Sequence, residues 1–354
     1  MLKKELILVC GSGGVGKTTT AAALGLKAAL DGKKVIVLTI DPAKRLATSL
    51  GLSELKSEPQ KINAGAGVSF YAMMLDSKST FDQLVVKYAP SKDIEKKILS
   101  NKIYQHLSGM IAGSQEYMAM EKLYEIVQGG EFELVIVDTP PTTHAIDFLE
   151  SPEKMVSALG NSMIHLLLKP ALLVGKSGLK LVEKGTRLLF KVFDRITGFA
   201  FLQDISEMLI LFQDLLGGFQ TRAGDVRKIL QQPGTSFLLV AAPEEKSVRE
   251  TALFKEKLAG FGLPFGGIVL NRVHPEYAGR QKNSENLPEK VGKELAQKME
   301  KILEKNSAYA ERDKKFAREL KSMLEPGQTP VLVPLFETDI HDLEGLKRLG
   351  EYFF

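Results

Sequence analysis

The sequence predicts an α/β fold, in which a mostly parallel, doubly wound sheet carries an inserted α-helical subdomain. Short, fully apolar runs recur along the chain, and each is followed by a polar loop. Such runs are typical of strands buried on both faces of a parallel sheet. Helical segments alternate with these runs, as expected when helices cover both faces. Two longer stretches are helical in pattern and interrupt this alternation, which predicts a separate helical layer.

The N-terminal part of the chain alternates strand and helix. Residues 6–9 form the first apolar run and lead into glycines, and residues 18–30 are rich in Ala and Leu. The pair Asp31-Gly32 then forms a typical helix stop. Residues 35–40 predict the second strand, which ends at Asp41. Four more strands of the same kind are predicted at residues 134–137, 236–241, 267–270 and 330–333.

The two helical stretches are residues 76–129 and 151–233, and we expect them to form the inserted subdomain. The sheet domain then comprises residues 1–75, 130–150 and 234–354. Residues 155–220 are rich in Leu, Phe and Met, and two interpretations stay open. They either form a helix core packed on the sheet domain, or line a groove for an apolar client helix.

Composition excludes several function classes. The chain has 354 residues and a net charge of +4, with no Arg-rich arm, so we expect no nucleic-acid partner. Its single cysteine, Cys10, excludes a disulfide framework and favours a cytoplasmic location. The longest apolar region of the middle of the chain, residues 164–193, is interrupted by several lysines and an arginine. No membrane span is therefore expected.

Residues 11–18 read GSGGVGKT and match G-x-x-x-x-G-K-T, between a predicted strand and a predicted helix. Glycines let backbone amides curve around phosphate oxygens, and the helix directs its positive end at the anion. We expect Lys17 to reach the β- and γ-phosphates, Thr18 to ligate Mg²⁺ and Thr19 to contact the α-phosphate. The predicted nucleotide-binding residues of this loop are Gly11, Ser12, Gly13, Gly14, Val15, Gly16, Lys17, Thr18 and Thr19.

Two aspartates follow predicted strands directly. Asp41 opens the segment DPAKRLA, and Asp138 opens the segment DTPPTTH. Ligands bind at the carboxyl ends of strands in open α/β sheets, so both are candidate site residues. Asp41 could equally cap a helix that has Pro42 at its first position, and both interpretations can hold together. Asp138 is predicted to reach Mg²⁺ through water, with a plain turn residue as the alternative.

Five motifs occur in a characteristic order, namely VCGSGGVGKTTTAAALG, LTIDPAKRLATSLG, VDTPPTTHAIDFLESP, VLNRV and VPLFETDI. This set resembles the arsenite-efflux and tail-anchored-protein-targeting ATPase family of the SIMIBI group of P-loop proteins. The resemblance spans nearly the whole chain. It implies a homodimeric ATPase that uses ATP and Mg²⁺.

The resemblance also implies individual roles. Asp41 would orient the attacking water, with Lys17 as the second catalytic residue, and Asp138 would contact Mg²⁺ through water. Asn271, after a later strand, would read adenine, although capping of the strand end stays open as its role. Backbone of the loop that holds Pro334 and Phe336 would also contact the base. His144 lies in a switch segment, where it could be a surface or capping residue, and no general-base role is predicted.

The chain departs from the family at Ser12. The family carries a lysine there that neutralises phosphate charge across the dimer, and serine is too short and neutral to do so. Lys44 and Arg45 could replace that charge or be solvated surface residues, and we predict slow basal turnover. The single cysteine excludes both a CxxC zinc pair and an intrachain three-thiol arsenite site.

Three biological roles stay open for such an ATPase. The first is a chaperone-like ATPase that shields a hydrophobic protein segment. The second is the energising subunit of a membrane anion pump, which needs a membrane-protein partner. The third is a nucleotide-dependent scaffold or regulator with little hydrolysis. The helical insert favours the first, the missing thiols weaken the arsenite form of the second, and Ser12 gives some weight to the third.

Overall fold

The computed structural model describes residues 5–41, 45–101, 104–105, 114–141, 221–222, 224–275 and 292–353. The chain divides into two units. The first comprises Met1–Met74, Gly129–Ile146 and Leu230–Phe354, and the second comprises Leu75–Gln128 and Asp147–Ile229. The domain boundaries drawn from the sequence stay a prediction, because residues 151–220 lie outside the described part of the chain.

The first unit contains an eight-stranded sheet in the order β3-β4-β2-β5-β1-β6-β7-β8. All neighbouring strands are parallel except β3 and β4 at one edge. The predicted α/β fold class is therefore confirmed. The strands are β1 (Leu6–Gly11), β2 (Val35–Thr39), β3 (Gln60–Lys61), β4 (Phe70–Met74), β5 (Leu134–Asp138), β6 (Thr235–Ala241), β7 (Phe265–Val273) and β8 (Val331–Pro334).

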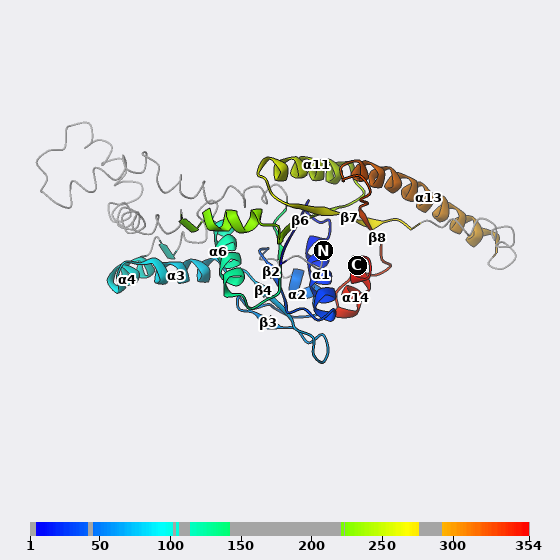
Figure 1. The fold of residues 1–354 in the computed structure, drawn as a ribbon. Coiled ribbons are helices and arrows are strands. Elements are labelled where there is room, and N and C mark those ends of the chain that lie inside the picture. The colour runs from blue at the N-terminus through cyan, green and yellow to red at the C-terminus, as the bar shows by residue number, and fades with distance from the viewer. Residues whose placement is uncertain are drawn as a thin grey trace, which may run out of the picture. The chain divides into compact units, whose positions relative to one another are not determined.

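Helices cover the strands of this unit on two sides (Figure 1). On one side lie α1 (Lys17–Leu30) and α14 (Leu343–Gly350), and on the other lie α11 (Glu245–Gly260) and α13 (Lys293–Ser322). A short helix, α2 (Arg45–Ser49), packs beside α1. Small residues of α1 such as Ala22 are buried with strand residues such as Val37, which brings the helix close to the sheet.

Register brings polar residues of different strands to one level. Asp138, the last residue of β5, is the partner of Val9 in β1 and of Thr39 in β2. Because β1, β2 and β5 run parallel, their carboxyl ends meet at the same edge of the sheet. The phosphate loop begins at this edge, since β1 ends at Gly11.

The edge hairpin of β3 and β4 is not among the predicted strands. Its longer strand reads FYAMM, and the glycine-rich turn before it gives no clear strand boundary.

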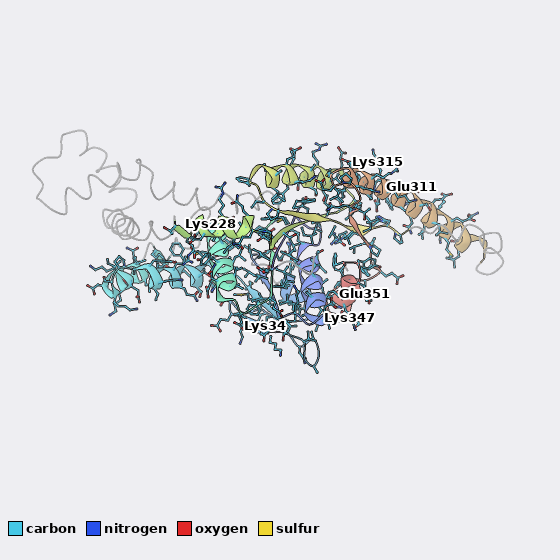
Figure 2. The ribbon with its side chains drawn as sticks, viewed as in Figure 1. Lys34, Lys228, Glu311, Lys315, Lys347 and Glu351 are labelled. Carbon is cyan, nitrogen blue, oxygen red and sulfur yellow. The ribbon has the colours of Figure 1, made fainter. Side chains whose placement is uncertain are left out.

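Exposed charges cover the outer helices of the same unit. Glu311 and Lys315 of α13 and Lys347 of α14 are examples (Figure 2). The Lys- and Glu-rich α13 is therefore a surface helix.

The second unit is helical where it is described, with α3 (Ser77–Tyr88), α4 (Lys92–Ser100) and α6 (Ser114–Gly129). Asp76 caps α3 by accepting a hydrogen bond from the Ser79 backbone N–H at 3.0 Å. Inside this unit Tyr117 donates a hydrogen bond to Glu121, and burial raises the pKa of that carboxyl. Within the described residues, no helix is both long enough and apolar enough to cross a bilayer.

Candidate functional site

The phosphate loop joins β1 to α1 and turns sharply at Gly16. Gly16 has a φ of 95°, a left-handed conformation that favours glycine. A Cβ atom at this position would lie 2.3 Å from Nδ2 of Asn271, so any side chain here would have to displace that amide. The Gly16 cap offers α1 no side-chain hydrogen bond. The first amides of α1 therefore remain suited to an anion, as in other phosphate sites at helix N-termini.

Lys17 is the first residue of α1 and is only 7% exposed. Its Nζ donates a hydrogen bond to the Ser12 carbonyl at 2.9 Å. Burial lowers the pKa of the Lys17 ammonium, and the nearby Asp138 carboxylate opposes that shift. A buried cation held over the loop by a carbonyl is suited to exchange that contact for phosphate oxygens.

Asp138 is 1% exposed and connects three segments. Its Oδ2 accepts hydrogen bonds from the hydroxyls of Thr18, at 2.7 Å, and Thr39, at 2.9 Å. Its Oδ1 is buried and has no hydrogen-bond partner among the described residues. Burial raises the pKa of Asp138 to about 6, although both threonine hydroxyls and Lys17 favour the charged form. An orphaned carboxylate oxygen beside a threonine hydroxyl suits a hard, oxygen-seeking cation such as Mg²⁺.

Asp41 follows β2 and faces the same pocket as Lys17. Its Oδ2 lies 3.5 Å from a guanidinium nitrogen of Arg45, at the start of α2. Arg45 also lines the pocket, so one basic residue that could compensate for Ser12 is present there. The other candidate, Lys44, lies outside the described residues, as does His144.

Asn271 stands where β7 passes the phosphate loop. Its Nδ2 donates a hydrogen bond to the Val15 carbonyl at 2.8 Å, and its Oδ1 accepts one from the Arg272 backbone N–H at 3.0 Å. Arg272 has a φ of 64°, a rare conformation for a residue with a side chain. Such backbone outliers are common at ligand sites. The amide of Asn271 thus connects the end of β7 to the loop.

These segments enclose a pocket of about 810 Å³, within the range of small-molecule sites. It brings together nine of the predicted residues, namely Gly14, Gly16, Lys17, Thr18, Thr19, Asp41, Asn271, Pro334 and Phe336. Gly11, Ser12, Gly13, Val15 and Asp138 are not in its lining. Other lining residues were not predicted, among them Thr48, Thr338, Asp339 and His341. Thr48 lies within the motif LTIDPAKRLATSLG, and Thr338 and Asp339 lie within VPLFETDI, but neither motif assigned them a role.

Comparison with known families matches most of the chain. Residues 4–309 match the family described as anion-transporting ATPase. The chain belongs to the anion-transporting ATPase family. This membership confirms the predicted family, and the chain is an ATPase.

Relatives of this ATPase carry two kinds of name. A protein provisionally named arsenical pump-driving ATPase 1, from Aquifex aeolicus, is 27% identical over 99% of this chain and 78% of its own length. The ATPase get3 of Aspergillus terreus is 26% identical over 84% of this chain and 82% of its own. The ATPase ASNA1 homolog 1 of Paramecium tetraurelia is 25% identical over 98% and 91%.

The serine of this ATPase's loop has an unpredicted partner. Ser12 is 8% exposed, and its hydroxyl donates a hydrogen bond of 2.5 Å to Oε2 of Glu250 on α11. Glu250 lies 238 positions away in the sequence, and the charged pattern of α11 is that of any solvated helix. Neither a serine at position 12 nor a glutamate at position 250 predicts this hydrogen bond from the sequence. The residue that replaces the family's lysine is thus held by a carboxylate.

Cys10 of this ATPase lies inside β1 and is buried. Burial raises the pKa of its thiol to about 12. Thiolates rather than thiols bind soft metals and metalloids, and no second cysteine exists in the chain. Cys10 therefore behaves as a small core residue.

Proposed function

We propose that the pocket binds ATP with its phosphates on the loop of residues 11–18 and its base near Asn271, Pro334 and Phe336. The main support is the arrangement around Asp138. One oxygen accepts from Thr18 and Thr39, and the other has no partner among the described residues. Lys17 would release the Ser12 carbonyl and bind the β- and γ-phosphates. The loop amides and the start of α1 would hold the remaining phosphate oxygens.

The oxygen atoms of Thr18 and Asp138 fit Mg²⁺, with Asp138 acting through water. Bound there, Mg²⁺ would neutralise charge on the phosphates. The protein's own task is to keep these two oxygens in place. Thr39 contributes to this task, because its hydroxyl fixes the same Asp138 oxygen that Thr18 binds. Support for the hydroxyl–carboxylate pair comes from the burial of Asp138, which keeps water from competing with it.

Asp41 would orient the water that attacks the γ-phosphorus. The new bond joins the water oxygen to that phosphorus, the bond to the bridging oxygen breaks, and ADP and phosphate leave. Asp41 accepts a hydrogen bond from the water. Arg45, whose guanidinium lies 3.5 Å from Asp41, would bring a cation close to the phosphates. We expect slow turnover, because the Arg45 side chain is largely exposed and its pairing correspondingly weak.

We further propose that a homodimer couples hydrolysis to movement of the switch loops and the helical unit, and that its load is a hydrophobic protein segment. Support comes from the Leu-, Phe- and Met-rich composition of residues 155–220, which lie outside the described residues. A pump-driving role is the second candidate, favoured by the name of the Aquifex aeolicus relative. The buried, protonated Cys10 disfavours an arsenite site within the chain.

The test is Asp41→Asn. ATP affinity, measured by calorimetry, should stay within about threefold of the wild type, while single-turnover hydrolysis should fall at least about 100-fold. The matched control is Asp31→Asn, which changes an exposed aspartate at the far end of α1 and should hydrolyse ATP normally. Unchanged hydrolysis in Asp41→Asn would refute the role of this residue. Failure of the wild type to bind ATP would refute the proposed function itself.

A further inference from the structure

Ser12 connects two helices that are far apart in the sequence. Its hydroxyl donates to Glu250 on α11 at 2.5 Å, and its carbonyl accepts from Lys17 at the start of α1 at 2.9 Å. Ser12 is 8% exposed, so water has little access to either contact. Any displacement of Ser12 therefore moves both the loop and the anchor of the Lys17 ammonium.

The charge of Glu250 works against the proposed phosphate site beside it. A carboxylate beside an anion site repels the anion. The ammonium of Lys246 lies 3.9 Å from the other oxygen of Glu250, and that lysine side chain is 87% exposed. A surface pairing of this kind contributes little. Through the hydrogen bond that it accepts from Ser12, Glu250 contacts the phosphate loop directly.

The part of the loop after Ser12 needs such an anchor. Gly13 and Gly14 are exposed, and a Cβ atom on either would meet nothing within 4 Å in the described part of the chain. Consecutive glycines in open space have the greatest backbone freedom of any residues. Ordering them costs conformational entropy, which is reduced when the residue before them is already fixed. Ser12 is that residue, and Glu250 fixes its side chain.

We propose that Glu250 is a positioning residue of the phosphate loop. Through the Ser12 hydroxyl it holds the loop in the conformation that presents its backbone amides and Lys17 to the phosphates. The bond gives the serine at this position a function of its own, in place of the lysine typical of the family. This inference rests on the proposed ATP site.

The experiment compares Glu250→Ala, Glu250→Gln, Ser12→Ala and the double variant Ser12→Ala/Glu250→Ala. Calorimetric affinity for ADP with Mg²⁺ and the kcat and KM for ATP are measured for each. Glu250→Ala and Ser12→Ala should each weaken ADP binding about tenfold, or ~1.4 kcal/mol. The double variant should be no weaker than the single ones, because both remove one bond. Glu250→Gln should stay within about twofold, since its amide oxygen still accepts from the hydroxyl.

The matched control is Glu256→Ala, an exposed glutamate of the same helix, which should bind ADP like the wild type. Thermal unfolding of each variant shows whether weaker ADP binding comes from the lost hydrogen bond or from a loss of folded protein. Tighter binding by Glu250→Ala and Glu250→Gln alike would mean that charge repulsion dominates, and would overturn the proposal. Multiplying effects in the double variant, or wild-type binding by Glu250→Ala, would overturn it too. Lys17→Ala distinguishes failure of the Glu250 inference from failure of the proposed ATP site, since it tests the ATP site without involving Glu250.

Discussion

The two ends of the pocket are built in different ways. At the phosphate end, Lys17 and Asp138 are almost fully buried, and hydrogen bonds connect the loop to β2 and β5. At the base end, Leu335 and Arg272 are exposed, and the ring of Phe336 lies against side chains near the C-terminus of the chain. The phosphate loop and the buried ends of β2 and β5 form the first, whereas the end of β7, the end of β8 and the loop after β8 form the second. We therefore expect the residues of the phosphate end to stay in place and those of the base end to adjust to the bound base.

Among the substitutions at the two ends of the pocket, removal of the buried Lys17 ammonium should weaken nucleotide binding most. Lys17→Ala leaves the phosphate end without its ammonium, and we expect nucleotide affinity to fall at least about 100-fold for every base. Calorimetry with ATP, ADP and GTP measures this. The exposed Lys61 of β3 provides the control variant Lys61→Ala, which should bind all three normally. Retained affinity in Lys17→Ala would show that the phosphates bind elsewhere.

The pH dependence of metal binding tests the buried carboxylate. Burial raises the pKa of Asp138 to about 6, so this group holds a proton below that pH in the free protein. A proton and Mg²⁺ compete for it, and the half-saturating Mg²⁺ concentration should rise about tenfold for each pH unit below about 6. It should be flat above about pH 7. Titrations of ATPase activity with Mg²⁺ between about pH 5 and about pH 8 provide the measurement.

Asp138→Asn is the control for that titration. The variant has no ionisable group at this position, so the remaining Mg²⁺ dependence should lose its step near the Asp138 pKa of about 6. A step of the same size in this variant would assign the titration to another group, and Asp138 would then have no part in holding the metal.

A substitution at the base end should weaken nucleotide binding less, and the loss should depend on which base is bound. Asn271→Ala removes the amide that bonds to Val15 and to the Arg272 backbone. We expect about tenfold weaker ATP binding and a loss of the preference for ATP over GTP. Competition between the two nucleotides for a fluorescent ADP analogue measures that preference. An equal loss for ATP and GTP would mean that Asn271 only supports the loop.

Local patterns in the sequence predicted most of the sheet and nine of the residues that line the pocket. The apolar strands, the glycine loop and the aspartates at strand ends are all local features, and the structure brings Lys17, Thr18, Asp41 and Asn271 to one pocket. Their roles in catalysis and binding stay predictions. Family membership is shown by the match over residues 4–309, a range that includes the glycine loop, both aspartates and Asn271.

Contacts between distant segments were not predictable. The Ser12–Glu250 bond and the Thr39–Asp138 bond each join common residue types with no periodic signal. The left-handed Arg272 was hidden for a similar reason, because nothing in the residue type requires that conformation. The β3–β4 hairpin was missed since its strands are short and its turn is glycine-rich. Each of these features arises from tertiary packing, which a pattern of neighbouring residues does not encode.

The most direct test is a crystal structure of the chain with Mg²⁺ and a non-hydrolysable ATP analogue. We predict that the triphosphate lies along residues 13–18 with Lys17 bound to it, that the metal lies beside Thr18 and reaches Asp138 through water, and that the base lies at Asn271 and Phe336. A base at the phosphate loop, or a metal that has no contact with Thr18 or with water held by Asp138, would contradict this account.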